Sequence, residues 1–461
     1  MGQVIIKYWY FLFPLLLASY CSVGYAHPDE HFQILEFAQY KLGRTTSDIL
    51  PWEFHSKIRS ALQPGLVYVL VKLWENPFGN INPFYFTFFL RFLSSTLSFL
   101  SIILLFRAFK MDLKSFKVYY LLSCSLWFMP YVMVRFSSET WSGIFLGFGI
   151  YFLFQENRKK LSLFFAGILF GLAILFRIQI AFSIFGILMW LIFYRHFLLA
   201  SLCSFGLLFT LLFGFAIDHW FYGEYVSTFY QYYFYNIVKG VANSFGTYGI
   251  WYYPLLYLIH LFPLISIPFI FLIGRFIYFQ RNHIITWAFI PFLFIHFLIP
   301  HKEIRFLYPM FIFIPLIIFY NWDYISRLFI QHYKISRAII GINFILLFII
   351  CLKPADIMVH NIKILSQNGE YKKNIYLPPE VRKYYYNKTL MTFYETFDTI
   401  PSKNTRFIFD TYKNNSIKVQ NYRLIEDDLF KLIYWQKLGD NFELFQWYSC
   451  NRNNICTVPK N

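Results

Sequence analysis

The chain has 461 residues, of which 58% are hydrophobic, 24% aromatic and 14% charged. Soluble domains carry about 25% charged residues, so this composition excludes an ordinary soluble protein and predicts an all-α polytopic membrane protein. The net charge of +17 does not indicate a nucleic-acid partner, because many Lys and Arg residues lie in short loops between apolar stretches, where they set membrane topology.

Apolar stretches of membrane-spanning type recur along the first 350 residues, and we expect about eleven transmembrane helices. The first stretch also has features of a cleavable signal peptide, but the many spans that follow favour an uncleaved helix. The predicted spans are 8–26, 84–106, 118–134, 139–154, 161–177, 180–194, 197–217, 251–274, 284–300, 306–320 and 338–352.

The basic residues predict the orientation of these spans. Loops rich in Lys and Arg, such as 107–117 and 158–160, alternate with loops that hold few, so the N-terminus is expected in the cytoplasm and the C-terminus outside. The remaining polar clusters then fall on the non-cytoplasmic face, where loops from several spans can form one site. These clusters are residues 27–33, 135–140, 177, 218–250 and 301–306.

Two regions are expected in the chain. Residues 1–352 form the membrane domain, whose first non-cytoplasmic loop is 27–83. Residues 353–461 are polar and contain alternating stretches such as "TRFIFDTY", which predict a small non-cytoplasmic α/β or β domain.

The first loop opens with "HPDEH", residues 27–31, which has three interpretations. His27, Glu30 and His31 match the H-x-x-E-H spacing of inverted zinc proteases, although Pro28 at a helix start places His27 at the cap rather than on the helix. Asp29 and Glu30 then occupy the first turn, where the helix dipole stabilises a carboxylate that can act as a general base. The third interpretation is an ordinary polar helix start.

Three further stretches carry candidate binding residues. In "LPWEFHSKIRSAL", Trp52 and Glu53 suit an interfacial polar contact and Arg59 suits an anion. The basic residues of "HKEIRF" are expected within one helical turn, where they can hold a phosphate. In the loop 218–253, four side chains can hydrogen-bond or stack on sugars. The candidates in these last two stretches are His301, Lys302, Arg305, Asp218, Tyr222, Asn236 and Trp251.

Together the four stretches resemble glycosyltransferase family 22, the polytopic mannosyltransferases that use a lipid-phosphate mannose. "HPDEHFQ", "WEF…IRSAL", "D…FYG…N…FG…W" and "HKEIRFLYP" occur in the family's order over about residues 27–310. "HPDE" and "IRSAL" resemble the branch that elongates glycosylphosphatidylinositol (GPI) anchors, whereas "RFSSET" matches its segment only loosely.

The resemblance implies a GT-C fold, with residues 1–352 as its transmembrane catalytic domain. It also implies an inverting mannosyltransferase, with a polyprenyl (dolichyl) phosphate-mannose donor and a lipid-linked glycan acceptor. Asp29 would be the base, with Glu30 orienting the acceptor hydroxyl or sharing the role, and His301, Lys302 and Arg305 would hold the donor phosphate. His27 is expected to bind substrate. We expect no obligatory metal, a monomer among membrane lipids, and a site facing the endoplasmic reticulum lumen or the bacterial periplasm.

Other functions are kept as alternatives. A bacterial family 22 enzyme would act on an envelope glycan. A membrane metalloprotease would need His27 and His31 as zinc ligands. A lipid-glycan transporter would need charged residues buried in mid-span, for which Arg177 is the candidate.

Overall fold

The computed structural model describes residues 2–79, 81–112, 115–155, 159–254, 263–356 and 359, together with short strands between 375 and 457. Its contacts divide the chain into two compact units. The first consists of Met1–Tyr20 and Asp29–Cys351, and the second of Cys21–Pro28 and Leu352–Asn461.

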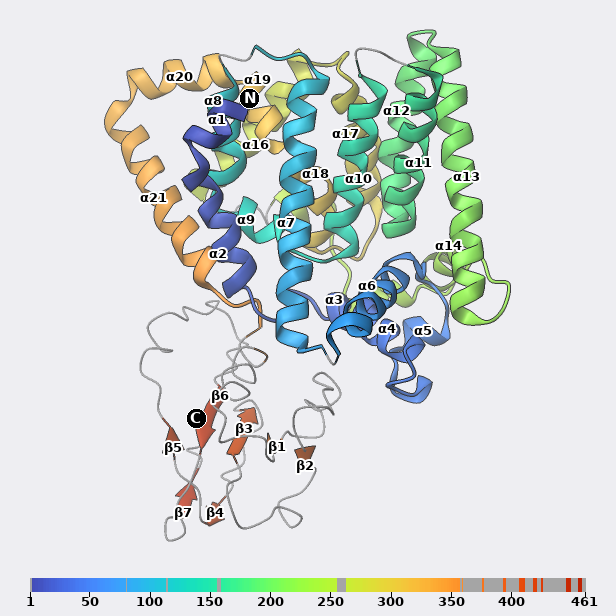
Figure 1. Cartoon of the computed structure of the whole chain (residues 1–461). Coiled ribbons are helices and arrows are strands. Elements are labelled where there is room, and N and C mark those ends of the chain that lie inside the picture. The colour runs from blue at the N-terminus through green and yellow to red at the C-terminus, as the bar shows by residue number, and fades with distance from the viewer. Residues whose placement is uncertain are drawn as a thin grey trace. The chain divides into compact units, whose positions relative to one another are not determined.

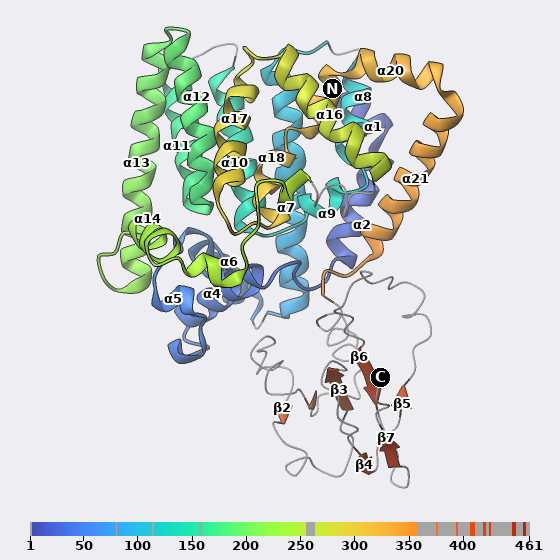
Figure 2. The ribbon, with the colours of Figure 1, turned by 180° about the vertical axis from the view of Figure 1, so that it is seen from behind.

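The described part of the first unit is helical. Figures 1 and 2 show its long helices running side by side in one bundle, with α3–α6 and α14 gathered at one end. Its N-terminal half contains α1 (Gly2–Lys7), η1 (Trp9–Leu12), α2 (Phe13–Cys21), α3 (Pro28–Glu30), η2 (His31–Leu35), α4 (Glu36–Lys41), η3 (Ser47–Ile49), α5 (Trp52–His55), α6 (Leu62–Phe78), α7 (Pro83–Ala108), α8 (Phe116–Ser125), α9 (Met129–Met133), α10 (Ser138–Leu153) and α11 (Lys160–Phe176). Its C-terminal half contains η5 (Ile178–Ile180), α12 (Ala181–Phe193), α13 (Phe197–Tyr222), α14 (Thr228–Tyr233), η6 (Phe234–Val238), η7 (Val241–Phe245), α16 (Pro263–Phe279), α17 (Ile284–Leu298), η8 (Ile304–Leu307), α18 (Tyr308–Phe311), α19 (Ile314–Tyr320), α20 (Trp322–Gln331) and α21 (Tyr333–Leu352).

Three of the described helices, α7, α13 and α21, are long and apolar enough to cross a membrane, and several shorter apolar helices accompany them. The predicted spans 118–134 and 306–320 are each divided into short helices. In these stretches Pro130, Pro309 and Pro315 lie in the first turns of α9, α18 and α19, where a missing backbone N–H is tolerated. Part of the predicted span 251–274 lies outside the described residues, and the count of eleven spans remains a prediction.

The helices α11 and α13 pack with their backbones in contact. A Cβ atom at Gly167 would lie 2.0 Å from the carbonyl oxygen of Cys203, and one at Gly206 would lie 2.1 Å from that of Phe164. No side chain fits at either position, so glycine allows the two backbones to touch. This contact fixes α11, which ends at the residue before Arg177.

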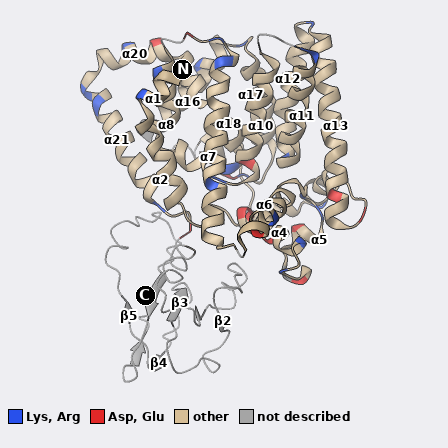
Figure 3. Ribbon diagram, viewed as in Figure 1, with Lys and Arg blue, Asp and Glu red and all other residues tan. Residues whose placement is uncertain are grey.

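Charged residues are distributed unevenly over the bundle. Figure 3 shows Lys and Arg gathered around α20 and the N-terminus, whereas Asp and Glu lie mainly at the opposite end, around α4 and α5. The polar site described below lies on the elements of that second end and on the helix ends that reach it.

In the second unit, short β-strands are described between residues 375 and 457. Its five-stranded sheet has the order β2-β1-β3-β6-β5, with β1 parallel to β2 and β3 and the other pairs antiparallel, and β4 pairs antiparallel with β7. The alternating stretch "TRFIFDTY" contains β3. The strands are β1 (Ile375–Tyr376), β2 (Phe393–Tyr394), β3 (Arg406–Asp410), β4 (Lys418–Gln420), β5 (Leu424–Ile425), β6 (Phe445–Tyr448) and β7 (Ile455–Thr457).

Candidate active site

The acidic motif lies at the start of a continuous helical segment. Pro28 is the first residue of α3, Asp29 and Glu30 complete its first turn, and the chain continues through the π-helix η2 into α4. Pro has no N–H to lose at a first helical position, and acidic side chains there meet the positive end of the backbone dipoles. The local structure therefore agrees with the helix start expected at Pro28.

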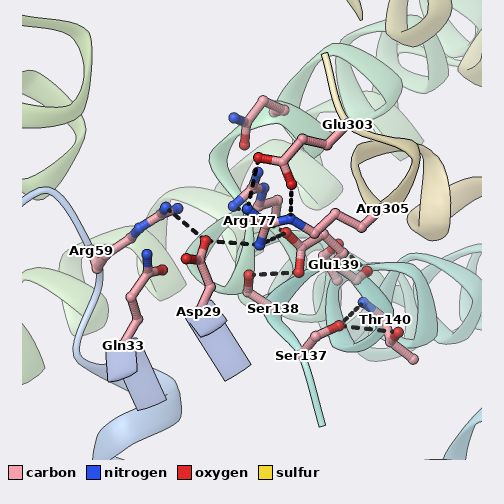
Figure 4. Close-up of polar contacts among 12 residues, drawn as sticks. Asp29, Gln33, Arg59, Ser137, Ser138, Glu139, Thr140, Arg177, Glu303 and Arg305 are labelled. Carbon is pink, nitrogen blue, oxygen red and sulfur yellow. Dashed lines mark hydrogen bonds and ion pairs between the residues drawn. The ribbon is translucent and has the colours of Figure 1, made fainter. Parts of the chain in front are cut away.

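Asp29 is held by two guanidinium groups. Its Oδ2 accepts a hydrogen bond from Arg305 Nη1 at 2.8 Å, and Arg59 Nη2 approaches the same oxygen at 3.5 Å (Figure 4). Asp29 and Arg305 are 276 residues apart in the chain. The fold thus brings the acidic motif and the basic motif into direct contact.

Arg305 is surrounded by carboxylates. Besides Asp29, its Nη1 lies 3.3 Å from Glu139 Oε1, while Nε and Nη2 donate to the two oxygens of Glu303 at 2.5 and 3.2 Å. Burial opposes the charged form of Arg305, but these three carboxylates outweigh it and raise the pKa of the guanidinium above its usual value. The result is a permanent cation whose direction is set by three anions.

The start of α10 positions Glu139. Ser137 caps this helix, its Oγ accepting from the backbone N–H of Thr140 at 3.2 Å, and Ser138 Oγ donates to Glu139 Oε2 at 3.2 Å. The other carboxylate oxygen, Oε1, faces Arg305 and lies 3.3 Å from Arg177 Nη1. Glu139 is 1% exposed, so its contacts with the two guanidinium groups are shielded from water, which strengthens them.

A glycine keeps α10 close to the segment that carries Arg305. A Cβ atom at Gly143 would lie 2.6 Å from the carbonyl oxygen of Pro309. Pro309 follows Arg305 by one helical turn, and Gly143 follows Glu139 by one turn. The absence of a side chain at Gly143 therefore helps to place Glu139 and Arg305 within contact distance.

The stretch 52–63 forms a second side of the site. Gln33 Nε2 donates to Glu53 Oε1 at 3.1 Å, and burial raises the pKa of Glu53 despite the nearby guanidinium of Arg59. Trp52 lies against the rings of Phe245 and Tyr235, with ring centroids 6.4 and 6.2 Å apart.

Tyr222 and Asp218 hold this stretch in place rather than facing Asp29. The Tyr222 hydroxyl donates to the backbone carbonyl of Arg59 at 2.8 Å. Asp218 is 2% exposed and accepts hydrogen bonds from Ala61 N at 2.6 Å, from Thr228 Oγ1 at 2.9 Å and from Ser60 Oγ. Both residues were predicted to bind substrate, a role that remains a prediction, and in the structure they fix the backbone around Arg59.

The "HKEIRF" stretch is not one helical turn, contrary to the prediction. Glu303 is extended, and η8 begins only at Ile304, so neighbouring side chains diverge. His301 stays with the cluster, because its Nε2 lies 2.9 Å from Glu303 Oε1 and its Nδ1 lies 3.0 Å from the carbonyl of Gly246. Lys302 turns away from it.

Lys302 lies at the C-terminal end of α17. Its ammonium is 1% exposed and donates to the carbonyls of His296, Phe297 and Ile299. A cation at this end satisfies carbonyls that have no partner in the helix and meets the negative end of the dipole. The placement supports a structural role, and the phosphate-binding role of Lys302 remains only a prediction.

For Glu30, Asn236 and Trp251 the structure shows other surroundings. Glu30 contacts a different guanidinium, that of Arg135, at 3.9 Å. Asn236, in η6, donates to the carbonyl of Tyr232 in α14, and Trp251 is 71% exposed. His27 belongs to the second unit.

Three residues of the cluster were not among the predicted site residues. They are Glu139, Arg177 and Glu303. Each lies in a polar stretch that the sequence places on the same membrane face, so the signal existed. It could not be resolved to single residues, because it does not say which side chain points inward.

The zinc interpretation has no geometric support in the first unit. His31 Nε2 lies 2.9 Å from Glu36 Oε1, and among the described residues no group of three or more His, Cys, Asp and Glu side chains is arranged to hold a metal ion. The cluster instead combines carboxylates with guanidinium groups. Such an arrangement can accept a proton at Asp29 and hold an anion at the arginines.

Comparison with known proteins identifies the family. A model of the Alg9-like mannosyltransferase family matches residues 7–376. A search of curated proteins and a search of solved structures each found no match. The family match covers most of the chain and all four motifs, and the long apolar helices agree with an integral membrane protein. The chain therefore belongs to the Alg9-like mannosyltransferase family of glycosyltransferases.

Proposed function

We propose that this enzyme transfers mannose from a polyprenyl-phosphate-mannose to a hydroxyl of a lipid-linked glycan, with inversion at the anomeric carbon. The observation that carries the proposal is the 2.8 Å contact between Asp29 and Arg305. Inverting transfer needs a base beside the incoming hydroxyl and a cation beside the departing phosphate. Asp29 and Arg305 are neighbours that can line one flank of the reacting sugar carbon, with Asp29 towards the hydroxyl and Arg305 towards the phosphate.

The proposed reaction is a single displacement. The acceptor oxygen attacks the anomeric carbon and its proton passes to a carboxylate oxygen of Asp29. The bond between the anomeric carbon and the phosphate oxygen breaks, and its electron pair leaves with the polyprenyl phosphate. The phosphate thereby gains negative charge next to Arg305, which stabilises it through charge-assisted hydrogen bonds.

The ion pair couples these two events. While Asp29 is ionised, it competes for Arg305 Nη1. Once Asp29 has taken the acceptor proton it is neutral, and its hold on the guanidinium weakens at the moment when the phosphate becomes more negative. Proton transfer thus makes the cation more available to the leaving group.

The remaining predicted residues are assigned around these two. Glu30 orients Asp29 or the acceptor hydroxyl, and His301 steadies Glu303 beside Arg305. Trp52, Glu53 and Arg59 form the acceptor side, with the indole available to a sugar face. Trp251 and Asn236 are proposed to contact substrate at the rim.

The proposed setting is the non-cytoplasmic face of a membrane. The gathering of Lys and Arg at the end of the bundle away from α4 and α5 supports a cytoplasmic location for that end (Figure 3). The resemblance of "HPDE" and "IRSAL" to the GPI branch supports a GPI-type glycolipid as acceptor and the endoplasmic reticulum as location. A bacterial envelope glycan is the alternative acceptor.

The test is mannose transfer by the purified enzyme. Radiolabelled polyprenyl-phosphate-mannose is offered with a panel of lipid-linked glycans, with and without EDTA, and the anomeric configuration of the product is determined by NMR. We expect EDTA-insensitive transfer with inversion, with the responding acceptor naming the pathway. Transfer only from a nucleotide sugar, or a product that retains configuration, would refute the proposal.

A further inference from the structure

Arg177 is a buried cation that the proposed reaction has not yet used. It follows the last residue of α11 in an extended conformation and precedes η5, so its side chain leaves the helix end rather than packing along it. It is 5% exposed. The natural expectation for such a guanidinium is a full set of hydrogen-bond acceptors.

The surroundings of Arg177 supply fewer hydrogen-bond acceptors than its guanidinium needs. Arg177 Nη1 lies 3.3 Å from Glu139 Oε1, and the guanidinium carbon lies 4.9 Å from the centroid of the Phe306 ring. The contact with Glu139 lacks hydrogen-bond geometry, and within the described part of the chain buried Nη1 has no hydrogen-bond acceptor. An unsatisfied buried donor on a charged group is costly, which indicates that a further anion belongs beside it.

The position of that anion follows from the second guanidinium. Arg305 Nη1 lies 3.3 Å from the same oxygen, Glu139 Oε1, and its guanidinium carbon lies 5.2 Å from the same ring, that of Phe306. Arg177 and Arg305 are therefore neighbours on one carboxylate, that of Glu139 (Figure 4), and both lie near one aromatic ring. Asp29 and Glu303 also pair with Arg305.

We propose that Arg177 is a second ligand of the donor phosphate, so that the phosphate lies between Arg177 and Arg305. This inference rests on the lipid-phosphate donor of the proposed function. The planar guanidinium of Arg177 can present a fork of donors to two phosphate oxygens, whereas the donors of Arg305 already face Asp29, Glu139 and Glu303. Arg305 attracts the phosphate from the side of Asp29 by its charge and through the Nη1 that Asp29 releases on protonation, and Arg177 holds it from the side of α11. Glu139 keeps the two cations from separating when the phosphate leaves.

The experiment measures binding of a short polyprenyl phosphate, farnesyl phosphate, by competition in a scintillation proximity assay, with farnesol as the ligand that lacks the phosphate. For Arg177→Gln we expect farnesyl phosphate to bind about tenfold to a hundredfold more weakly, with farnesol unchanged. Arg177→Lys keeps the positive charge but loses the fork of donors. Its affinity for farnesyl phosphate should lie between those of the wild type and Arg177→Gln.

Arg91→Gln is the matched control. Arg91 is also 5% exposed, and its Nε donates to the carbonyl of Ser19 at 2.8 Å, so its loss reproduces the cost of removing a buried guanidinium without touching this site. We expect Arg91→Gln to lower the melting temperature and to retain the affinity for farnesyl phosphate.

The outcomes separate this inference from the proposed function. Suppose that the wild-type protein prefers farnesyl phosphate to farnesol and that Arg177→Gln binds farnesyl phosphate as tightly as the wild type does. The proposed role of Arg177 would then be wrong, and the proposed lipid-phosphate donor would still hold. If the wild-type protein shows no preference for the phosphate, the lipid-phosphate donor itself is wrong. If Arg177→Gln does not fold, Arg177→Lys decides: a loss of affinity supports the role and wild-type affinity refutes it.

Discussion

The contact between α10 and α18 makes Gly143→Ala a sensitive test of the site geometry. The new Cβ atom would lie 2.6 Å from the carbonyl oxygen and 2.9 Å from the Cα atom of Pro309, whereas ordinary contact begins at 3.4 Å. Because backbone atoms cannot rotate away, the two segments must separate by roughly 0.8 Å. The 3.3 Å contact between Glu139 and Arg305 would then lengthen to about 4 Å, which is no longer a hydrogen bond.

The expected consequences are a modest loss of stability and a large loss of rate. Overpacking costs about 1–3 kcal/mol, and a misplacement near 1 Å at a reacting centre costs on the order of a hundredfold in rate. The assay is mannose transfer per folded molecule, with thermal unfolding measured in the same detergent.

Gly149→Ala provides the comparison on the same helix. Its Cβ atom would lie 2.4 Å from the side chain of Phe170, on α11. We expect this variant to unfold at a lower temperature and to keep its transfer rate. Equal rate losses in both variants, or a wild-type rate in Gly143→Ala, would refute the claim that Gly143 sets the position of Arg305.

Three further changes test individual residues. Asp218→Asn places an amide where a buried carboxylate accepts three hydrogen bonds, so we expect unfolding to be easier by about 2–3 kcal/mol; an unchanged melting temperature would contradict this. Burial raises the pKa of Glu53, so its favourable contribution is present at acidic pH and is lost as pH rises through the folded-state pKa. Glu53→Gln, which can still accept from Gln33, should therefore gain stability relative to wild type between pH 4 and pH 7, and a difference independent of pH would argue against the buried carboxyl. Lys302→Met removes three hydrogen bonds to the end of α17 and should lower the melting temperature; lost phosphate affinity at native stability would instead favour the predicted phosphate role.

Hydrophobicity and breaker residues predicted much of the helical arrangement. The spans expected at 84–106, 139–154 and 284–300 correspond to α7, α10 and α17, because long apolar runs with clear ends leave few alternatives. The breaks between helices at Pro130 and Pro309 were not predicted. Both prolines lie inside continuous apolar stretches, and hydrophobicity alone does not show that a new helix begins there. The predicted separate C-terminal domain remains a prediction, although strands occur in the stretches that alternate.

Individual residues of the site were predicted from the sequence, but the contacts between them were not. Asp29 and Arg305 were named, and a helix start at Pro28 follows from simple rules for first turns. Glu139 faces Arg305 because of packing across the bundle, and Lys302 turns to the end of α17 because the backbone around it is not helical. Sequence periodicity carries no information about either, and this is why Lys302 was grouped with Arg305.

The most direct test of the account is the single-turnover rate of mannose transfer by Asp29→Asn, with donor prebound and acceptor in excess. Amide nitrogen cannot take the acceptor proton, so we predict a loss of about a hundredfold to ten-thousandfold in rate with farnesyl phosphate still bound. Glu30→Gln, beside it on the same turn, should lose less. A wild-type rate in Asp29→Asn, or a larger loss in Glu30→Gln, would contradict the assignment of Asp29 as the base.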